Sequence, residues 1–72
     1  MDSWKCDVLE CINKIDSNVF DLSDVYNFEE ELLNKHPQNN NVQAKIRQTL
    51  QLLRDDGILE FLDNNGNYKK VL

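Results

Sequence analysis

The sequence predicts an α+β fold in which three helices are combined with a small antiparallel sheet that ends in a hairpin. Three observations support it: apolar residues recur at helical spacing in three segments, a short alternating segment follows the first of them, and an Asn-Gly pair near the end separates two strand-like runs. The length of 72 residues corresponds to one domain, spanning 1–72. A chain of this size buries only about 60% of its unfolded surface, which leaves no room for a deep catalytic cleft.

The first helix is expected at residues 3–15, where apolar side chains recur every three or four positions. Ser3, or Asp2 before it, can cap its start through a side-chain oxygen. Its expected inner face is Trp4, Val8, Leu9, Ile12 and Ile15. We therefore interpret Trp4 as a core residue rather than a stacking platform.

A brief extended segment at residues 19–22 is expected to lead into a second helix at 23–35, with Ser23 as its N-cap. The apolar stripe of this helix is Val25, Tyr26, Leu32 and Leu33. Glu29 falls within the arc of that stripe, so it needs a partner. His36 precedes a proline and is interpreted as the end of the helix, not as a ligand.

The third helix is expected from residue 42 to 55 or 56, with Asn41 or Asn40 as its cap and Gly57 as its stop. Its apolar face is Val42, Ile46, Thr49, Leu50 and Leu53. The polar residues 36–41 connect it to the second helix.

The chain is expected to end in a hairpin, with strands at 58–62 and 67–72 and a turn at 63–66. An isolated two-stranded hairpin is only marginally stable, so residues 19–22 are expected to join it as a third strand. This order of elements is that of a winged helix-turn-helix. In such modules the second helix of the pair enters the DNA major groove, and here that helix is residues 42–55.

The charge distribution agrees with this assignment. The chain has 13 acidic and eight basic residues, for a net charge of −5, which argues against nonspecific binding of polyanions. However, residues 1–34 carry nine acids and two bases, whereas residues 35–54 carry four bases and no acid. The expected reading helix therefore lies in a locally cationic stretch.

The residue types on the outward face of this helix are suited to DNA. Gln48 and Gln51 can each donate to and accept from an adenine edge, and Ala44 can allow close approach or touch a thymine methyl group. Near the start of the helix, bases or phosphates are expected to be met by Asn40, Asn41 and Gln43. Phosphate contacts are expected from Lys45 and Arg47 on the helix and from Tyr68, Lys69 and Lys70 on the wing.

Each of these features has a plainer interpretation. A glutamine-rich face can simply be solvated, and Lys69 and Lys70 can protect an edge strand from pairing. Arg47 or Arg54 can form a structural ion pair with Glu29 instead of contacting DNA. The alternative function is a winged helix that binds a protein through the acidic first two helices.

Catalysis, cofactors and metal binding are not expected. Cys6 and Cys11 lie about 140° apart around one helix, so they cannot bridge within it, and neither has a neighbouring base. We expect reduced thiols in a cytoplasmic protein, because no signal peptide and no apolar run of membrane-spanning length is visible.

A specific resemblance strengthens the DNA hypothesis. It rests on Trp4-Lys5, 19–22, 24–26, Phe28-Glu29, His36-Pro37, 41–42, the stretch from Lys45-Ile46-Arg47-Gln48 to Arg54-Asp55, Gly57, Glu60-Phe61, Gly66 and Tyr68. Over residues 4–72 the chain resembles the C-terminal winged-helix domain of the Dam-replacing family of methyl-directed restriction endonucleases. That resemblance implies a module that reads double-stranded DNA, in some members adenine-methylated GATC, and assists a separate PD-(D/E)XK nuclease domain. The present chain has no nuclease motif, so it is expected to be either a domain of a parent chain that also holds a nuclease or a stand-alone relative.

Overall fold

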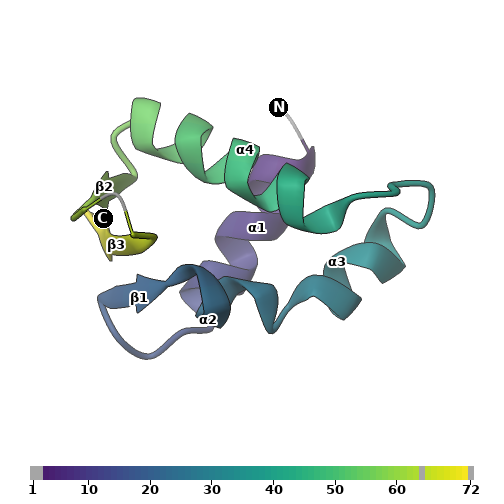
Figure 1. The fold of residues 1–72 in the computed structure, drawn as a ribbon, viewed down its shortest axis with the longest axis horizontal. Coiled ribbons are helices and arrows are strands. Elements are labelled where there is room, and N and C mark those ends of the chain that lie inside the picture. Colours follow the sequence, from purple (N-terminus) through teal and green to yellow (C-terminus); the bar gives the residue numbers. More distant parts are fainter. Residues whose placement is uncertain (1–2, 64, 72) are drawn as a thin grey trace.

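The computed structural model describes residues 3–63 and 65–71. Four helices and three strands follow one another in the order α1 (Ser3–Asn13), β1 (Val19–Asp21), α2 (Leu22–Tyr26), α3 (Glu29–Lys35), α4 (Val42–Asp55), β2 (Leu59–Phe61) and β3 (Asn67–Lys70). The sheet lies at one end of the molecule and α3 at the other, with α1 and α4 between them (Figure 1). The winged helix-turn-helix architecture predicted from the sequence is confirmed, with one helix more than expected.

The extra helix arises because the predicted helix at 23–35 is broken. The Phe28 N–H donates to the carbonyl of Val25 at 3.0 Å, a three-residue turn that closes α2 before α3 begins. Asn27, which lies at this break, favours local side-chain hydrogen bonds over helix, and aromatic residues such as Phe28 lose rotamer freedom in helices. Leu33, predicted to face inward, is 41% exposed, whereas Leu32 is fully buried.

The start of α2 also differs from the prediction, because its N-cap is Asp21 rather than Ser23. The Asp24 N–H donates to Oδ1 of Asp21 at 2.9 Å, and the Asp21 N–H donates to Oδ2 of Asp24 at 3.0 Å. This reciprocal capping box satisfies two backbone donors at once, which one serine cap does not. The helix therefore begins directly where β1 ends.

The predictions for α4 are confirmed. The Asn41 side chain caps the helix by accepting from the Ala44 N–H at 3.1 Å. Gly57 ends it with a φ of 80°, a conformation that side-chain-bearing residues rarely adopt. The five residues predicted for the inner face are all buried: Val42, Ile46, Thr49, Leu50 and Leu53.

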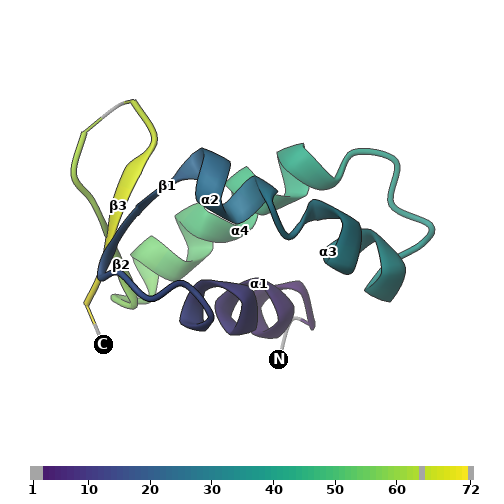
Figure 2. The ribbon, with the colours of Figure 1, turned by 90° about the horizontal axis from the view of Figure 1, so that it is seen from below.

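The sheet has the strand order β1–β3–β2, so residues 19–21 pair with the hairpin as predicted. Tyr68 on β3 takes part in both antiparallel ladders, opposite Phe20 on β1 and Phe61 on β2. The strands are shorter than expected, and Asn64 of the predicted turn and Leu72 of the predicted strand lie outside the described residues. Figure 2 shows the β2–β3 loop, which is the wing, extending away from α1.

None of the helices formed by the described residues is long and apolar enough to cross a membrane. Asp2, predicted as an alternative cap of α1, lies outside the described residues.

Neither cysteine forms a disulfide, as predicted, but the two differ in environment. Cys6 is exposed, whereas Cys11 is buried and its thiol donates to Oε2 of Glu31 at 3.4 Å. Burial, followed by the nearby Glu31 carboxylate, raises the pKa of Cys11 to about 11. Because the thiolate is the reactive form, Cys11 is expected to resist alkylation at pH 8.

The exposure of Cys6 and the burial of Cys11 give a test of the fold. A maleimide added at pH 8 is expected to modify one thiol of the native chain rapidly, and mass spectrometry of the digest should place the label on Cys6. Both thiols should react in urea. Equal labelling of Cys6 and Cys11 in the native chain would contradict the packing of α1 against α3.

Candidate nucleic-acid interface

The outer face of α4 presents the amide side chains on which the DNA hypothesis depends. Gln48 and Gln51 are exposed and three residues apart, so they lie on one face of the helix with half-buried Ala44. Oε1 of Gln48 accepts from Nζ of Lys45 at 3.4 Å. The side chain of Gln51 makes no hydrogen bond or ion pair with any residue in 3–63 or 65–71. Its amide is therefore available to an external partner.

At the start of α4 the predicted contact residues are partly engaged within the protein. The Asn41 side chain caps the helix, and the backbone N–H of Asn41 donates to Oδ1 of Asn39 at 2.8 Å. Nε2 of Gln43 donates to Oε1 of Glu29 at 2.9 Å. Asn40 is exposed. The connector and α3 thereby fix the position of this end of α4.

The Glu29–Gln43 hydrogen bond corrects one expectation. Glu29 is half-buried and does have a partner, but that partner is an amide rather than Arg47 or Arg54. An amide from the first turn of α4 reaches α3, whereas the two arginines lie farther along the helix.

The two arginines of α4 differ in their surroundings. Arg54 pairs with Asp55 at 3.2 Å, and its guanidinium lies 4.6 Å from the centre of the Phe61 ring. Arg47 is exposed, and its Nη1 donates to the phenol oxygen of Tyr26 at 2.7 Å. The positive charge of Arg47 therefore lies beside a neutral group.

The basic residues fall into two sets according to their ion pairs. Four pair with acids of the described chain: Lys5 with Asp56, Lys14 with Glu31, Lys35 with Asp7 and Glu10, and Arg54 with Asp55. The other four form no ion pair within 3–63 and 65–71: Lys45 and Arg47 on α4, and Lys69 and Lys70 on β3. The unneutralised cations thus lie on the two elements that the sequence assigns to DNA.

The Lys14–Glu31 pair shows how a lysine outside α4 and β3 is neutralised by an acid of the same chain. Nζ of Lys14 donates to both carboxylate oxygens of Glu31, at 3.1 and 3.0 Å. This contact, more than any other cause, raises the pKa of Lys14 and lowers the pKa of Glu31. Both groups therefore stay charged, and joined, over a wide range of pH.

The three candidate residues of the wing strand have different roles in the structure. Lys69 is exposed, whereas the Lys70 ammonium donates to the backbone carbonyl of Ile15 and so is engaged with the scaffold. Tyr68 is only 6% exposed, and burial raises its pKa. Its ring lies 5.5 Å from that of Phe20 and 4.9 Å from that of Phe61. Tyr68 is consequently a core residue with little surface left for the phosphate contact predicted for it.

The side chain of Asp63 holds the wing turn through hydrogen bonds. Oδ1 of Asp63 accepts from the Asn65 N–H at 2.8 Å, and Oδ2 accepts from the Asn67 side chain at 2.9 Å. These hydrogen bonds, led by that from Asn67, lower the pKa of Asp63. The Gly66 carbonyl also accepts from the Leu22 N–H at 3.0 Å, which ties the wing to the first residue of α2.

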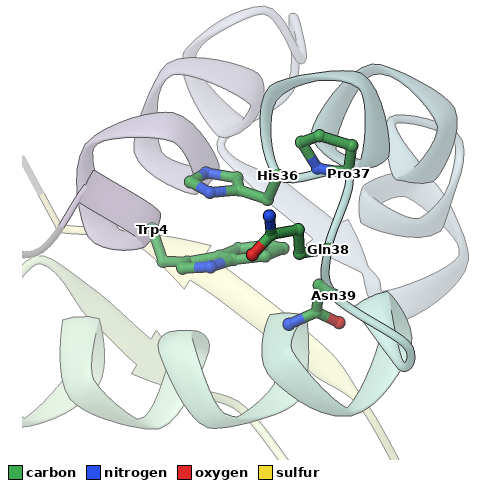
Figure 3. Close-up of a pocket in the computed structure, with 5 residues that line it drawn as sticks. All are labelled: Trp4, His36, Pro37, Gln38 and Asn39. Atoms are coloured by element: carbon green, nitrogen blue, oxygen red, sulfur yellow. The ribbon is translucent and has the colours of Figure 1, made fainter.

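A hollow of about 420 Å³ lies beside the connector between α3 and α4 (Figure 3). The rings of Trp4 and His36 stack there, 4.1 Å apart and inclined by 17°. Nε2 of His36 lies 2.6 Å from Oδ2 of Asp7 on α1. Trp4 is buried and His36 caps the end of α3, both as predicted, so this cluster holds the connector against α1. No group of three potential metal ligands occurs among the described residues.

Tyr26 is a neighbour of Arg47 that the sequence did not reveal. Its place in the apolar pattern predicts only a core residue, and part of the ring does pack against the core. That its hydroxyl meets Arg47, 21 positions later, depends on how α2 crosses α4. No local pattern encodes that contact.

The comparison with protein families agrees with this geometry. A family model described as the Dam-replacing HTH domain matches residues 1–70. The match covers α1 through β3, including the helix-turn-helix and the wing. A helix-turn-helix family of this kind indicates a DNA-binding domain. The chain therefore belongs to the family of Dam-replacing HTH domains.

Proposed function

We propose that this domain binds double-stranded DNA sequence-specifically, with α4 in the major groove. Gln48 and Gln51 read base edges, and Lys45, Arg47 and Lys69 hold backbone phosphates. The observation that carries the proposal is the distribution of cations, since those without an ion pair among the described residues lie on α4 and β3. A paired cation has to exchange a carboxylate for a phosphate, whereas these side chains already point to solvent or to neutral groups.

The contacts of the acidic half support DNA over a protein partner. Many of its carboxylates already have structural roles, in the capping box, in ion pairs with lysines, or as the acceptor for Gln43. Carboxylates that are engaged in this way have fewer oxygens available to an external cationic partner. The acidic side therefore serves as scaffold in this proposal.

The finer specificity that we propose is for GATC duplex methylated on adenine. The resemblance to methyl-directed restriction endonucleases supports it, as does the presence on α4 of glutamines suited to adenine edges. In the same proposal the domain binds and does not cut, and a nuclease domain of a parent chain supplies the cleavage.

Binding is expected to weaken steeply with salt. Three phosphate contacts correspond to a slope of about −2.7 in log K against log salt, so affinity should fall about 40-fold between 50 and 200 mM. Fluorescence anisotropy with labelled GATC duplexes, methylated and unmethylated, measures both the slope and the preference. The single variants K45M, R47M and K69M should each make the slope shallower by about 0.9.

The matched control is K14M, which removes a lysine that is paired with Glu31 on the scaffold. Its slope should equal that of the unaltered chain. Absence of binding to both duplexes at 50 mM salt would contradict the proposal. NMR shifts confined to residues 2–34 on addition of a protein partner would favour the protein-binding alternative instead.

A further inference from the structure

We infer that the Tyr26 phenol and the Arg47 guanidinium together form one phosphate-binding site, which extends the DNA interface from α4 onto α2. The inference rests on the function proposed above and adds a residue that the sequence analysis assigned to the core. Nη1 of Arg47 and the phenol oxygen of Tyr26 are 2.7 Å apart, although the residues are 21 positions apart in the chain.

The direction of this hydrogen bond leaves donors for an anion. Because the arginine donates, the phenol oxygen is the acceptor, and the phenol hydrogen is free to be donated elsewhere. Neither side chain makes another hydrogen bond or ion pair within 3–63 or 65–71. A phosphate oxygen placed beside the pair can accept from the phenol and from the remaining N–H groups of the guanidinium.

Arg47 is well suited to a phosphate rather than to a base. Its planar fork of donors matches the geometry of two phosphate oxygens, and its charge strengthens each bond. Helical spacing places Arg47 on a shoulder of α4, beside the outer face that carries Gln48 and Gln51. When such a face enters the major groove, its shoulders lie along the phosphate backbone.

The site also adjoins the wing. Burial raises the pKa of Tyr68 on β3, and the charges of Tyr26 and Arg47 also act on it, Tyr26 raising and Arg47 lowering the pKa. The Leu22–Gly66 hydrogen bond joins the wing to α2 in the same region. Asp63 also acts on Tyr68, but its oxygens are occupied by Asn65 and Asn67. If the phosphate backbone of a DNA strand passed between α4 and the wing, it would meet the Tyr26–Arg47 pair.

Tyr26 acts partly by holding the guanidinium in place. A long arginine side chain loses rotamer freedom when it binds, and a partner that fixes it beforehand lowers that cost. Tyr26 is half-buried against the core, so its ring is a firm support. Loss of the hydroxyl should therefore weaken phosphate binding without changing the number of charges.

A double-mutant cycle tests the inference on the full chain. R47M should weaken binding to all duplexes alike and make the salt slope shallower by about 0.9. Y26F removes one neutral hydroxyl, so it should weaken binding by roughly 2- to 10-fold at an unchanged slope. The double variant Y26F/R47M should bind only slightly more weakly than R47M, by a factor clearly smaller than the one Y26F causes in the unaltered chain, because the two donors share one phosphate. Circular dichroism shows whether each variant is folded, and K14M is the charge-removal control.

A series of duplexes, each with one neutral methylphosphonate, locates the contact. A methylphosphonate at one position should weaken binding of the unaltered chain and have little effect on binding of R47M or of Y26F/R47M. Two results would overturn the inference while DNA binding itself stands. Y26F could bind with unaltered affinity, or the fold losses of affinity of Y26F and R47M could multiply in the double variant. If the unaltered chain binds neither duplex, the proposed function fails as well.

Discussion

Replacing Leu50 by alanine is expected to destabilise the domain by about 2–5 kcal/mol, the range for truncating a buried leucine. Leu50 lies on the inner face of α4 and is 0% exposed, so the substitution leaves a cavity at the centre of the core. A domain of this size has a stability of only several kcal/mol. We expect L50A to be largely unfolded at 37 °C, and urea denaturation followed by circular dichroism measures the loss.

Leu52 provides a matched control on the same helix. It is 37% exposed, and L52A removes the same atoms from the surface instead of the core. Its effect on the free energy of unfolding should be within about 1 kcal/mol. Similar losses for L50A and L52A would contradict the orientation of α4, and with it the assignment of the outer face to DNA.

Replacing Gln51 by alanine is expected to remove base discrimination at one position of the site. A good bidentate contact to a base is worth about 1–3 kcal/mol of discrimination. The Gln51 side chain is exposed and has no polar partner among the described residues, so it can contact DNA without breaking an internal contact. Selection from a pool of partly randomised duplexes identifies the preferred sequence for the unaltered chain, and the same selection with Q51A should be degenerate at one base pair.

Gln38 is the control for this substitution. It is an exposed glutamine in the connector, away from the outer face of α4. Q38A should select the same sequences as the unaltered chain, with a similar affinity. If Q51A kept the full preference of the unaltered chain, Gln51 would not read a base, and the glutamine-rich face would be a solvated surface.

Two features of α4 show how far local chemistry specifies this fold. The side-chain oxygen of Asn41 and the left-handed conformation of Gly57 fix the ends of the helix using residues adjacent in the chain. The apolar spacing between them fixes which face is buried. Both signals lie within one element, so the sequence alone predicts them.

The middle helix shows where local reasoning stops. Its apolar spacing is compatible with one continuous helix, and the two residues at the break, Asn27 and Phe28, disfavour helix only weakly. In the structure Phe28 packs against the core. The partner of Glu29 follows from the placement of α3 beside the first turn of α4. Propensity and period do not define these arrangements.

The order of the elements in a winged helix, the core of α4, the wing and the cationic stretch that contains α4 can all be predicted from the chain, because each is a local pattern of spacing or charge. Packing in three dimensions sets which cations are neutralised, that Tyr68 is buried, and that Tyr26 meets Arg47. Ion pairs and hydrogen bonds join residues that are distant in the chain, and which of them meet depends on how the helices cross. The face available to DNA is therefore predicted by sequence, while the contacts within it are set by packing.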